Sequence, residues 1–231
     1  MAASRILYGV PVSQPVRAVL WLCASQELPI ELKKTIPPKQ TKSPEFLALN
    51  PRGKIPVLQE DDFVLAEGAA IAQYLAESNG WDALYPKDAR RRAKIHEALS
   101  WSGAELRPST FFVAPLLRPD IVFSERRSEA MKKEFGKNMD AFERILASNG
   151  GFAAAGEPTL ADYFTYAELG QFRVGFDVSP LTGERMWDFA AWKGVQKWLD
   201  AMAALPGHDE MHAPLVQYAG YLKAQAAKAK P

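Results

Sequence analysis

Short apolar runs alternate with amphipathic stretches along the first eighty residues. Residues 6–8 form an apolar run that ends at Gly9, which is typical of a buried strand. Pro15 then opens a stretch in which apolar residues recur at helical spacing, and proline suits the first turn of a helix because its missing N–H needs no partner there. Residues 30–33 alternate apolar and polar side chains, as a second strand does.

The same unit continues with a helix, a hairpin and a further helix. Ser43 followed by Pro44 predicts a helix start, with serine as the cap. Residues 55–58 and 63–65 predict the two strands of a hairpin, and residues 67–77 predict a helix with one apolar side. In the resulting order, β-α-β-α-β-β-α, the crossover makes the first two strands parallel and the hairpin adds an antiparallel edge.

Residues 81–87 break this pattern and form a linker, whose Leu84 and Tyr85 we expect to wedge between two domains. The spacing of apolar residues is helical from there onward. It predicts a long helix from Asp88 to about Leu117, one from Ser124, one from near Thr159 and one over about 186–205, before a small polar tail at 225–231 that should fray. The predicted fold class is an α/β domain at residues 1–80 followed by an all-α helical domain at residues 88–231.

Charge and composition exclude several classes of partner. The 28 basic and 27 acidic residues give a formal net charge of +1, whereas proteins that bind nucleic acid or anionic membranes carry a clustered basic excess. The one basic block, residues 90–92, fits a solvated helix face. No apolar run approaches the roughly 18 residues that a membrane helix needs. We therefore expect a chain that binds neither nucleic acid nor membranes.

Cys23 is the only cysteine, so no intrachain disulfide can form and the chain fits a reducing compartment. The first residues lack the apolar core of a signal peptide, which predicts a cytoplasmic protein. Cys23 lies on the apolar side of the first helix, where we expect a core side chain. His96, His208 and His212 lack metal-ligand spacing, so we predict no metal site and expect them at the surface or an interface.

Ser13 lies between the first predicted strand and the first predicted helix. A helix N-terminus has unpaired N–H groups and a partial positive charge, which stabilise anions such as a thiolate. A serine hydroxyl at that position can also donate a hydrogen bond to a sulfur anion. Lowering a thiol pKa by about two units takes about 2.7 kcal/mol of preferential thiolate stabilisation, which such a site can supply. The alternative is that Ser13 is only a helix cap.

Pro56 stands at the head of a predicted strand, where proline removes a donor from the ladder. A cis Ile55–Pro56 peptide would turn the Ile55 backbone N–H and C=O toward an extended peptide ligand, which then pairs as an added strand. The alternative is a trans proline on an edge strand, since only about 5–6% of X–Pro bonds are cis.

Two further pairs mark helix starts. Glu67 and Gly68 stand where a strand gives way to a helix. In the first turn, the Glu67 carboxylate would suit the helix dipole or pair with a ligand ammonium, and Gly68 leaves its N–H free for a carboxylate; ordinary capping is the alternative. Thr159 and Asp162, three residues apart, form a capping box and are interpreted as structural.

In this order and at these distances, the segments resemble the cytosolic glutathione transferases, most closely the theta class. Residues 13–19 are similar to the theta segment whose serine activates glutathione, and residues 50–58 resemble the cis-proline segment. Residues 101–107 resemble a theta stretch that ends in an active-site arginine, and residues 159–162 resemble the capping box of the family. The resemblance covers nearly the whole chain. It implies a thioredoxin-like N-terminal domain and a helical C-terminal domain that carries the electrophile pocket.

The resemblance also implies roles for individual residues. Ser13 donates to the glutathione sulfur, and Arg107 lies near the sulfur or the second substrate. The other implied contacts are Ile55 beside cis-Pro56 for the cysteinyl moiety, Lys54 for the glycyl carboxylate and Glu67 for the γ-glutamyl end. Two positions depart from the family pattern. Gly68 replaces the usual Ser or Thr that binds the γ-glutamyl carboxylate, and Thr41 stands where theta proteins often carry His, so its contact with the glycyl end is altered.

Apolar residues near these positions are candidates for the wall of an electrophile pocket, with core packing as the alternative. They are Val12, Phe111, Phe112, Leu116 and Phe172. The expected activity is conjugation of glutathione, as co-substrate and without a cofactor, to small apolar electrophiles. Peroxide reduction or dehalogenation at the same site, and a non-catalytic glutathione- or ligand-binding protein, remain as alternatives. By the same resemblance, we expect a homodimer with residues 69–74 and the long helices at its interface.

Overall fold

The computed structural model describes residues 4–117, 121–180, 183 and 185–229. The elements of its N-terminal part are β1 (Arg5–Gly9), α1 (Gln14–Ser25), β2 (Glu31–Lys34), a 3₁₀ turn η1 (Gln40–Lys42), α2 (Pro44–Leu49), β3 (Val57–Glu60), β4 (Phe63–Ala66) and α3 (Gly68–Asn79). Apart from the short turn η1, this is the predicted order β-α-β-α-β-β-α. Each strand and each helix differs from its predicted range by only a few residues.

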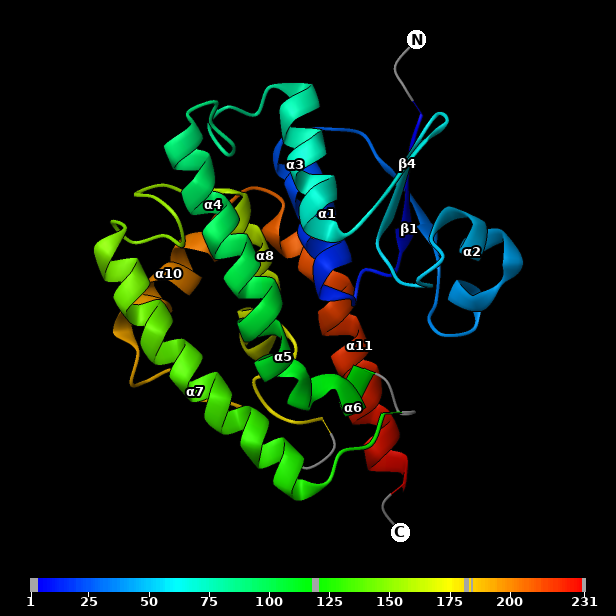
Figure 1. The fold of residues 1–231 in the computed structure, drawn as a ribbon. Coiled ribbons are helices and arrows are strands. Elements are labelled where there is room, and N and C mark those ends of the chain that lie inside the picture. Colours follow the sequence, from blue (N-terminus) through cyan, green and yellow to red (C-terminus); the bar gives the residue numbers. More distant parts are fainter. Residues whose placement is uncertain (1–3, 118–120, 181–182, 184, 230–231) are drawn as a thin grey trace.

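The four strands form one mixed sheet in the order β2-β1-β3-β4. β1 pairs parallel with β2 and antiparallel with β3, and β4 closes the hairpin as an antiparallel edge. Side chains alternate across the sheet, so Leu7 and Leu58 pack toward α1 and α3, whereas Tyr8 and Val57 pack with Phe46 of α2. Figure 1 shows α1 and α3 on the side of the sheet that faces the remaining helices, and α2 on the opposite side.

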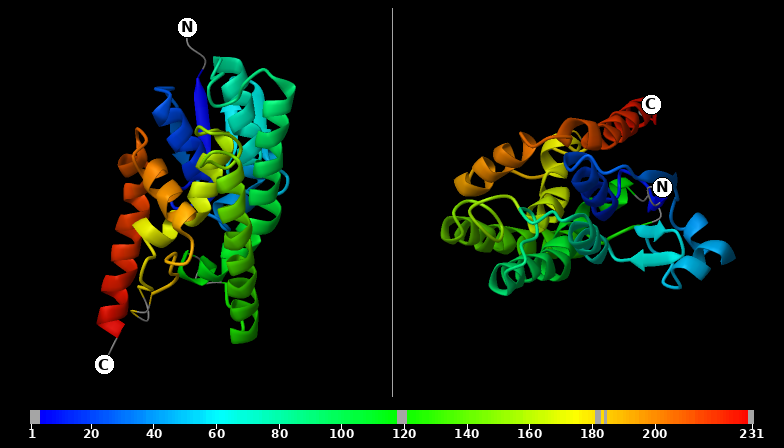
Figure 2. Two further views of the ribbon diagram at one scale, coloured as in Figure 1. Left: turned by 90° about the vertical axis from the view of Figure 1, so that its left-hand side faces the viewer. Right: turned by 90° about the horizontal axis from the view of Figure 1, so that it is seen from above.

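The second part of the chain is helical. Its helices are α4 (Ala89–Trp101), α5 (Arg107–Thr110), α6 (Ala114–Leu117), α7 (Glu125–Ser148), α8 (Leu160–Leu169), α9 (Gln171–Val174), α10 (Lys193–Ala203) and α11 (His208–Ala229). α8 is buried nearly all round, because it packs against α1, α4, α5 and α10. In both views of Figure 2 the helices gather around this central element, and α11 runs along the outside to the C-terminus. The α/β part followed by an all-α part confirms the predicted fold class.

The long helix predicted from Asp88 to about Leu117 is not continuous. α4 ends at Trp101 and is followed by a wide π-helical segment η2 (Ser102–Leu106), α5, a 3₁₀ turn η3 (Phe111–Val113) and α6. Pro108 has no amide hydrogen and its ring crowds the preceding turn, so it cannot extend a regular α-helix through this region. The prediction of a single helix was therefore wrong, although the chain keeps winding in the same direction.

Two predictions near the C-terminus also need correction. The helix predicted over about 186–205 begins only with α10 at Lys193, because the Glu143 carboxylate of α7 accepts the N–H groups of Gly194 and Val195, both at 2.8 Å. The tail predicted to fray continues α11 as helix as far as Ala229. The last two residues of that predicted tail lie outside the described part of the chain.

The linker between the two parts is anchored as expected. Leu84 and Tyr85 are buried, and the Leu84 carbonyl accepts the N–H of Leu160 at the start of α8. The Tyr85 hydroxyl contacts His96 of α4 at 2.8 Å. The linker therefore ties the sheet side of the molecule to α4 and α8. The boundaries of the two domains, at 80 and 88, remain predictions.

Candidate active site

Ser13 is the residue before the first turn of α1, in an extended conformation with φ −74° and ψ 126°. Its backbone is well ordered by hydrogen bonds: its N–H donates to Val10 and its C=O accepts from Arg17. Its side chain makes no capping bond to the helix, and no partner for the hydroxyl is found among the described residues. The Ser13 side chain therefore does not cap α1, and the alternative that it is only a helix cap is wrong. A half-buried hydroxyl is left at a helix N-terminus.

The Ile55–Pro56 peptide is cis, the first of the two alternatives. Pro56 is buried, Ile55 is half-buried and Lys54 is exposed. Asn50 fixes the preceding turn, because its side-chain amide donates to the Lys54 carbonyl at 2.8 Å. The segment approaches the sheet from the end at which α1 begins, since Tyr8 pairs with Val57.

Glu67 is not in the first turn of the helix, as the sequence predicted, but just before it. Its φ of 77° lies in the left-handed half of the map, where a residue with a side chain costs about 1–3 kcal/mol. The carboxylate pairs with Arg52 at 2.9 Å, and both side chains are more than half exposed. A strained backbone conformation thus stands directly before α3, and such conformations cluster at functional sites.

Gly68 is buried and follows Glu67 directly. A Cβ on this residue would lie 3.0 Å from the ring of Phe164 in α8 and 3.1 Å from Pro15 in α1. Both distances are shorter than ordinary van der Waals contact, so a side chain at this position would have to displace its neighbours. The departure from the family pattern at Gly68 therefore has a packing cause, which is the close approach of Phe164 and Pro15.

Thr41 is buried, and its hydroxyl donates to the Pro38 carbonyl at 3.2 Å. The Thr41 side chain therefore forms a hydrogen bond within its own turn and is not a free group that points toward a ligand. The backbone of Thr41 borders the turn before Lys54, because a Cβ on Gly53 would lie 2.8 Å from the Thr41 carbonyl oxygen. Gly53 has a φ of +62°, so both its conformation and this close approach require glycine.

Arg107 begins α5 and forms an ion pair with Glu168 of α8. Glu168 is buried, and its second carboxylate oxygen accepts the Thr110 hydroxyl at 2.9 Å. Burying a carboxylate is costly unless it is paired and hydrogen-bonded, and here both conditions hold. Arg107 remains about a third exposed, so its guanidinium is oriented by Glu168 and still reachable from solvent.

The candidate pocket residues divide into two groups. Phe112 and Phe172 stack on each other at 5.5 Å, and Phe172 contacts Phe135 at 5.2 Å. They pack in the core, which is the alternative that the sequence left open, and their place in an electrophile pocket stays a prediction. Leu116 is also buried within the core cluster, whereas Val12 and Phe111 are half-buried at its edge.

Cys23 and the histidines can now be placed. Cys23 is buried, and burial raises the pKa of its thiol to about 12, so it is the inert core residue that was predicted. His208 and His212 are not at the surface as expected but packed against Trp21. Burial lowers the pKa of His212 to about 3, which keeps it neutral. His96 is exposed, as expected.

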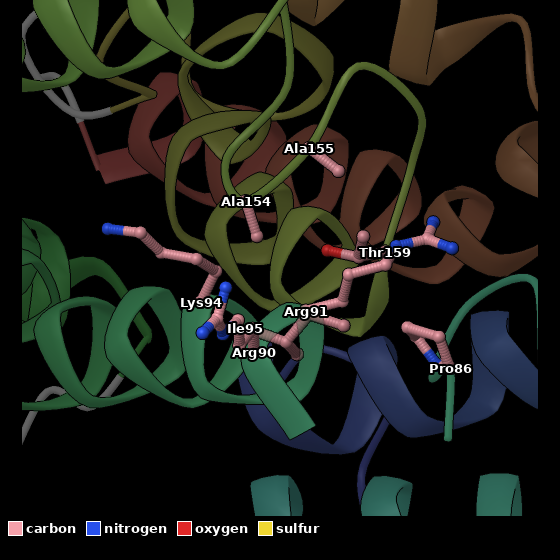
Figure 3. Close-up of a pocket in the computed structure, with 8 residues that line it drawn as sticks. All are labelled: Pro86, Arg90, Arg91, Lys94, Ile95, Ala154, Ala155 and Thr159. Atoms are coloured by element: carbon pink, nitrogen blue, oxygen red, sulfur yellow. The ribbon is translucent and has the colours of Figure 1, made fainter. Parts of the chain in front are cut away.

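Two cavities in the described part of the molecule lie away from Ser13. One, of about 220 Å³, lies between α4 and the segment before α8, where Arg91 reaches across to Glu157. Figure 3 shows it lined by Arg90, Arg91 and Lys94 on one side and by small alanines on the other. The other, of about 370 Å³, is bordered by Phe172, Arg185 and Asp200. Neither is lined by a residue of the predicted glutathione site.

Comparison with known proteins places this arrangement in a family. The N-terminal domain of the glutathione S-transferases matches residues 7–81. Glutathione S-transferase theta-2B from Homo sapiens is 32% identical over 219 residues, which cover 90% of this chain and 87% of that protein. The chain belongs to the glutathione S-transferase family.

Further relatives place the chain in the same family. Glutathione S-transferase T2 from Arabidopsis thaliana is 31% identical over 220 residues, which cover 90% of this chain. The chain spans only 36% of the length of that plant protein. Among solved structures, a delta-class glutathione transferase from Nilaparvata lugens matches with a TM-score of 0.80 at 28% identity, over 96% of this chain and 99% of that one. The predicted family and its theta-class resemblance are confirmed.

The fold brings several of the predicted site residues together. The Glu67–Gly68 turn meets the start of α1, because Gly68 packs beside Pro15, two residues after Ser13. Arg107 is linked to the same region, since the Gln171 side chain joins the Glu168 carbonyl at 2.8 Å to the Gln14 amide at 3.4 Å. Sequence reasoning missed Glu168 and Gln171, because no local pattern marks a polar partner on a distant helix.

Proposed function

We propose that this chain is a glutathione transferase in which the Ser13 hydroxyl stabilises the thiolate of glutathione and small apolar electrophiles are conjugated to it. The observation that carries the proposal is the uncommitted, half-buried hydroxyl of Ser13 at the N-terminus of α1, a helix of 12 residues. In a cap hydrogen bond the serine oxygen accepts a backbone N–H, which holds the side chain against the helix. Without that bond, the Ser13 side chain is free to turn its O–H toward an anion bound at the helix N-terminus, where the helix dipole also favours it.

The chemistry follows from the thiol. A free thiol titrates near 8.5 and is mostly protonated at neutral pH, so lowering its pKa to about 6.5 makes most of it the reactive thiolate. Holding that thiolate beside the electrophile adds a contribution from proximity. The thiolate lone pair forms the carbon–sulfur bond. In a substitution, the leaving group departs with the electron pair of the broken bond; in an addition, the π pair of an activated double bond moves onto the substrate, which then takes up a proton. No metal or other cofactor is needed, because glutathione itself is the co-substrate.

The remaining contacts of the proposed site follow the family resemblance. The Ile55 backbone beside Pro56 takes the cysteinyl moiety, and Lys54 the glycyl carboxylate. Glu67 lies near the γ-glutamyl end. Arg107, oriented by Glu168, provides a cation near the sulfur or the second substrate. Val12 and Phe111, which are only half-buried, are the better candidates for contact with an apolar electrophile.

A homodimer in the cytoplasm completes the proposal. Phe63 is 42% exposed and packs on Tyr74 at 4.8 Å, next to the predicted interface helix. An exposed phenylalanine on an edge strand, packed on a half-buried tyrosine of the neighbouring helix, is suited to burial by a second copy. The only cysteine is free and buried, as a reducing compartment allows. In the described residues, no helix is long and apolar enough to cross a bilayer.

The proposed function is tested by calorimetry with glutathione alongside a conjugation assay with an aromatic chloride. We expect saturable binding of glutathione and turnover that saturates with it. A panel of peroxides and haloalkanes at fixed glutathione concentration separates conjugation from peroxide reduction and dehalogenation. Binding without turnover on any of these substrates would favour the alternative of a non-catalytic binding protein. The tight packing around Gly68 is the observation that supports that alternative.

Restoring the missing hydroxyl at Gly68 is expected to strengthen glutathione binding once space is made for it. Gly68→Ser alone presses on Phe164 and should cost about 1–3 kcal/mol of stability. Combined with Phe164→Leu, the serine can reach the γ-glutamyl carboxylate, and a charge-assisted hydrogen bond of about 1.5–3 kcal/mol corresponds to about tenfold tighter binding or more. Calorimetry measures the affinity.

The matched control is Gly68→Ala combined with Phe164→Leu, which adds the same Cβ without the hydroxyl. Equal glutathione affinity for the serine and alanine versions would show that this position does not face the γ-glutamyl carboxylate.

A further inference from the structure

Arg17 is a charged residue on the inner face of α1, and its side chain is completely buried. Its guanidinium donates to the carbonyls of Pro11 at 3.3 Å and Val12 at 3.1 Å, the two residues directly before Ser13. The other terminal nitrogen donates to the Ala167 carbonyl near the end of α8, at 2.9 Å. A single side chain thus holds the turn that carries Ser13 against the central helix of the molecule.

The charge of Arg17 is not cancelled by a direct partner. No carboxylate of the described residues lies within ion-pair distance of it, and its Nε has no hydrogen-bond partner. The carboxylate that acts on the charge of Arg17 is Glu168, which already forms its ion pair with Arg107. Glu168 acts on both guanidinium groups, which together carry one positive charge more than it neutralises. Of the two, the guanidinium of Arg17 is completely buried and that of Arg107 is about a third exposed.

The other titratable groups that face Arg17 do not remove this excess. They are Tyr166 of α8 and His212 of α11, and His212 in turn stacks on His208, which is bonded to Asp209. Burial raises the pKa of Tyr166 to about 12 and lowers that of His212 to about 3, so both are neutral near pH 7. The Asp209 carboxylate is fully exposed and bonded to His208. Desolvation lowers the pKa of Arg17 only to about 10, so it remains charged.

We propose that Arg17 is a positioning residue of the Ser13 site, whose buried guanidinium fixes the Pro11–Val12 turn and whose uncompensated charge stabilises an anion bound beside the Ser13 hydroxyl. The inference rests on the proposed function, because the anion is the glutathione thiolate. A buried charge close to a bound thiolate acts in a medium of lower effective dielectric than water, so its effect on the thiol is large. Arg17 does not touch the sulfur and acts through the turn and through its field.

The test is a pH titration of the thiolate absorbance of glutathione bound to the full chain, with saturation checked by calorimetry. Arg17→Met removes the charge and should raise the apparent pKa of the bound thiol by about one pH unit. Arg17→Lys keeps the charge, and it should raise the apparent pKa of the bound thiol by less than half the shift seen in Arg17→Met. Glu168→Gln removes the shared carboxylate and should lower the apparent pKa, the opposite direction.

These opposite shifts distinguish an electrostatic role from a merely structural one, which would reduce activity in every variant and leave the pKa unchanged. An unchanged pKa in Arg17→Met and Glu168→Gln, with glutathione still bound, would overturn this inference alone. If Arg17→Met does not fold, Glu168→Gln decides, and a pKa that fails to fall overturns the inference. A wild-type chain that does not bind glutathione, or binds it with the pKa of the free thiol, overturns the proposed function and this inference with it.

Discussion

Replacing Ser13 with alanine is expected to raise the apparent pKa of bound glutathione by about one to two pH units, because one charge-assisted hydrogen bond to the thiolate, about 1.5–3 kcal/mol, is lost. At neutral pH, kcat/KM for conjugation should fall by about ten- to a hundredfold. The loss of kcat/KM relative to the wild type should be greatest at pH values below the raised pKa. It should shrink as the pH approaches that pKa, because the thiol of the variant complex then ionises as well. Stability should change by less than about 0.5 kcal/mol, since the hydroxyl makes no bond within the protein.

Ser43 is the matched control for this substitution. It also precedes the first turn of a helix with a proline, but its hydroxyl accepts the Phe46 N–H at 3.3 Å and therefore caps α2. Ser43→Ala should cost about 1 kcal/mol of stability and leave the pKa of the bound thiol unchanged. A Ser13→Ala variant that loses stability, as Ser43→Ala does, while the pKa of the bound thiol stays the same would contradict a role of Ser13 in stabilising the thiolate.

Asp162→Ala is expected to produce the largest loss of stability, about 3–5 kcal/mol. The Asp162 carboxylate is fully buried at the start of α8 and accepts four hydrogen bonds: from Ala153 N–H at 2.7 Å, Trp198 Nε1 at 2.9 Å, and the Thr159 N–H and hydroxyl at 2.8 and 3.0 Å. Burial raises the pKa of this carboxyl, while the hydrogen bonds act to lower it. Alanine would leave all four donors buried without a partner. Denaturant unfolding measures the free energy.

Asp88→Ala provides the comparison for that variant. Asp88 is also an N-cap, accepting the Arg91 N–H at 2.9 Å, but it is exposed, so water can replace it. Its removal should cost about 1 kcal/mol. If Asp162→Ala destabilises the protein no more than Asp88→Ala does, the capping box is an ordinary cap and does not organise the core.

Sequence signals that act over a few residues predicted most elements of the fold. Pro44 after Ser43, and the capping box at Thr159 and Asp162, predicted where α2 and α8 begin, since these rules act over a few residues. The parallel pairing of β1 with β2 and the antiparallel hairpin of β3 and β4 followed from the alternation of short strands and helices. α10 shows the limit of this reasoning, because the acceptor for its first N–H groups is Glu143, about fifty residues earlier in the chain.

The candidate site divides in the same way. The sequence predicted the positions of Ser13, Pro56 and Glu67, because each of them stands at the boundary of a predicted strand or helix. The Arg107–Glu168 pair, the Arg17 contacts with the Ser13 turn and the approach of Phe164 to Gly68 join distant segments. Periodicity reports which face of a helix is apolar but not which partner it meets, so these contacts, and the burial of His208 and His212, appeared only in the structure.

The central claim is that Ser13 contacts the thiol of glutathione, and a crystal structure of the protein with glutathione bound tests it most directly. We predict that the sulfur lies within hydrogen-bond reach of Ser13 Oγ, about 3–3.5 Å, with the Ile55 backbone paired to the cysteinyl moiety. A sulfur bound beyond that reach, with the Ser13 hydroxyl turned to cap α1, would contradict the claim.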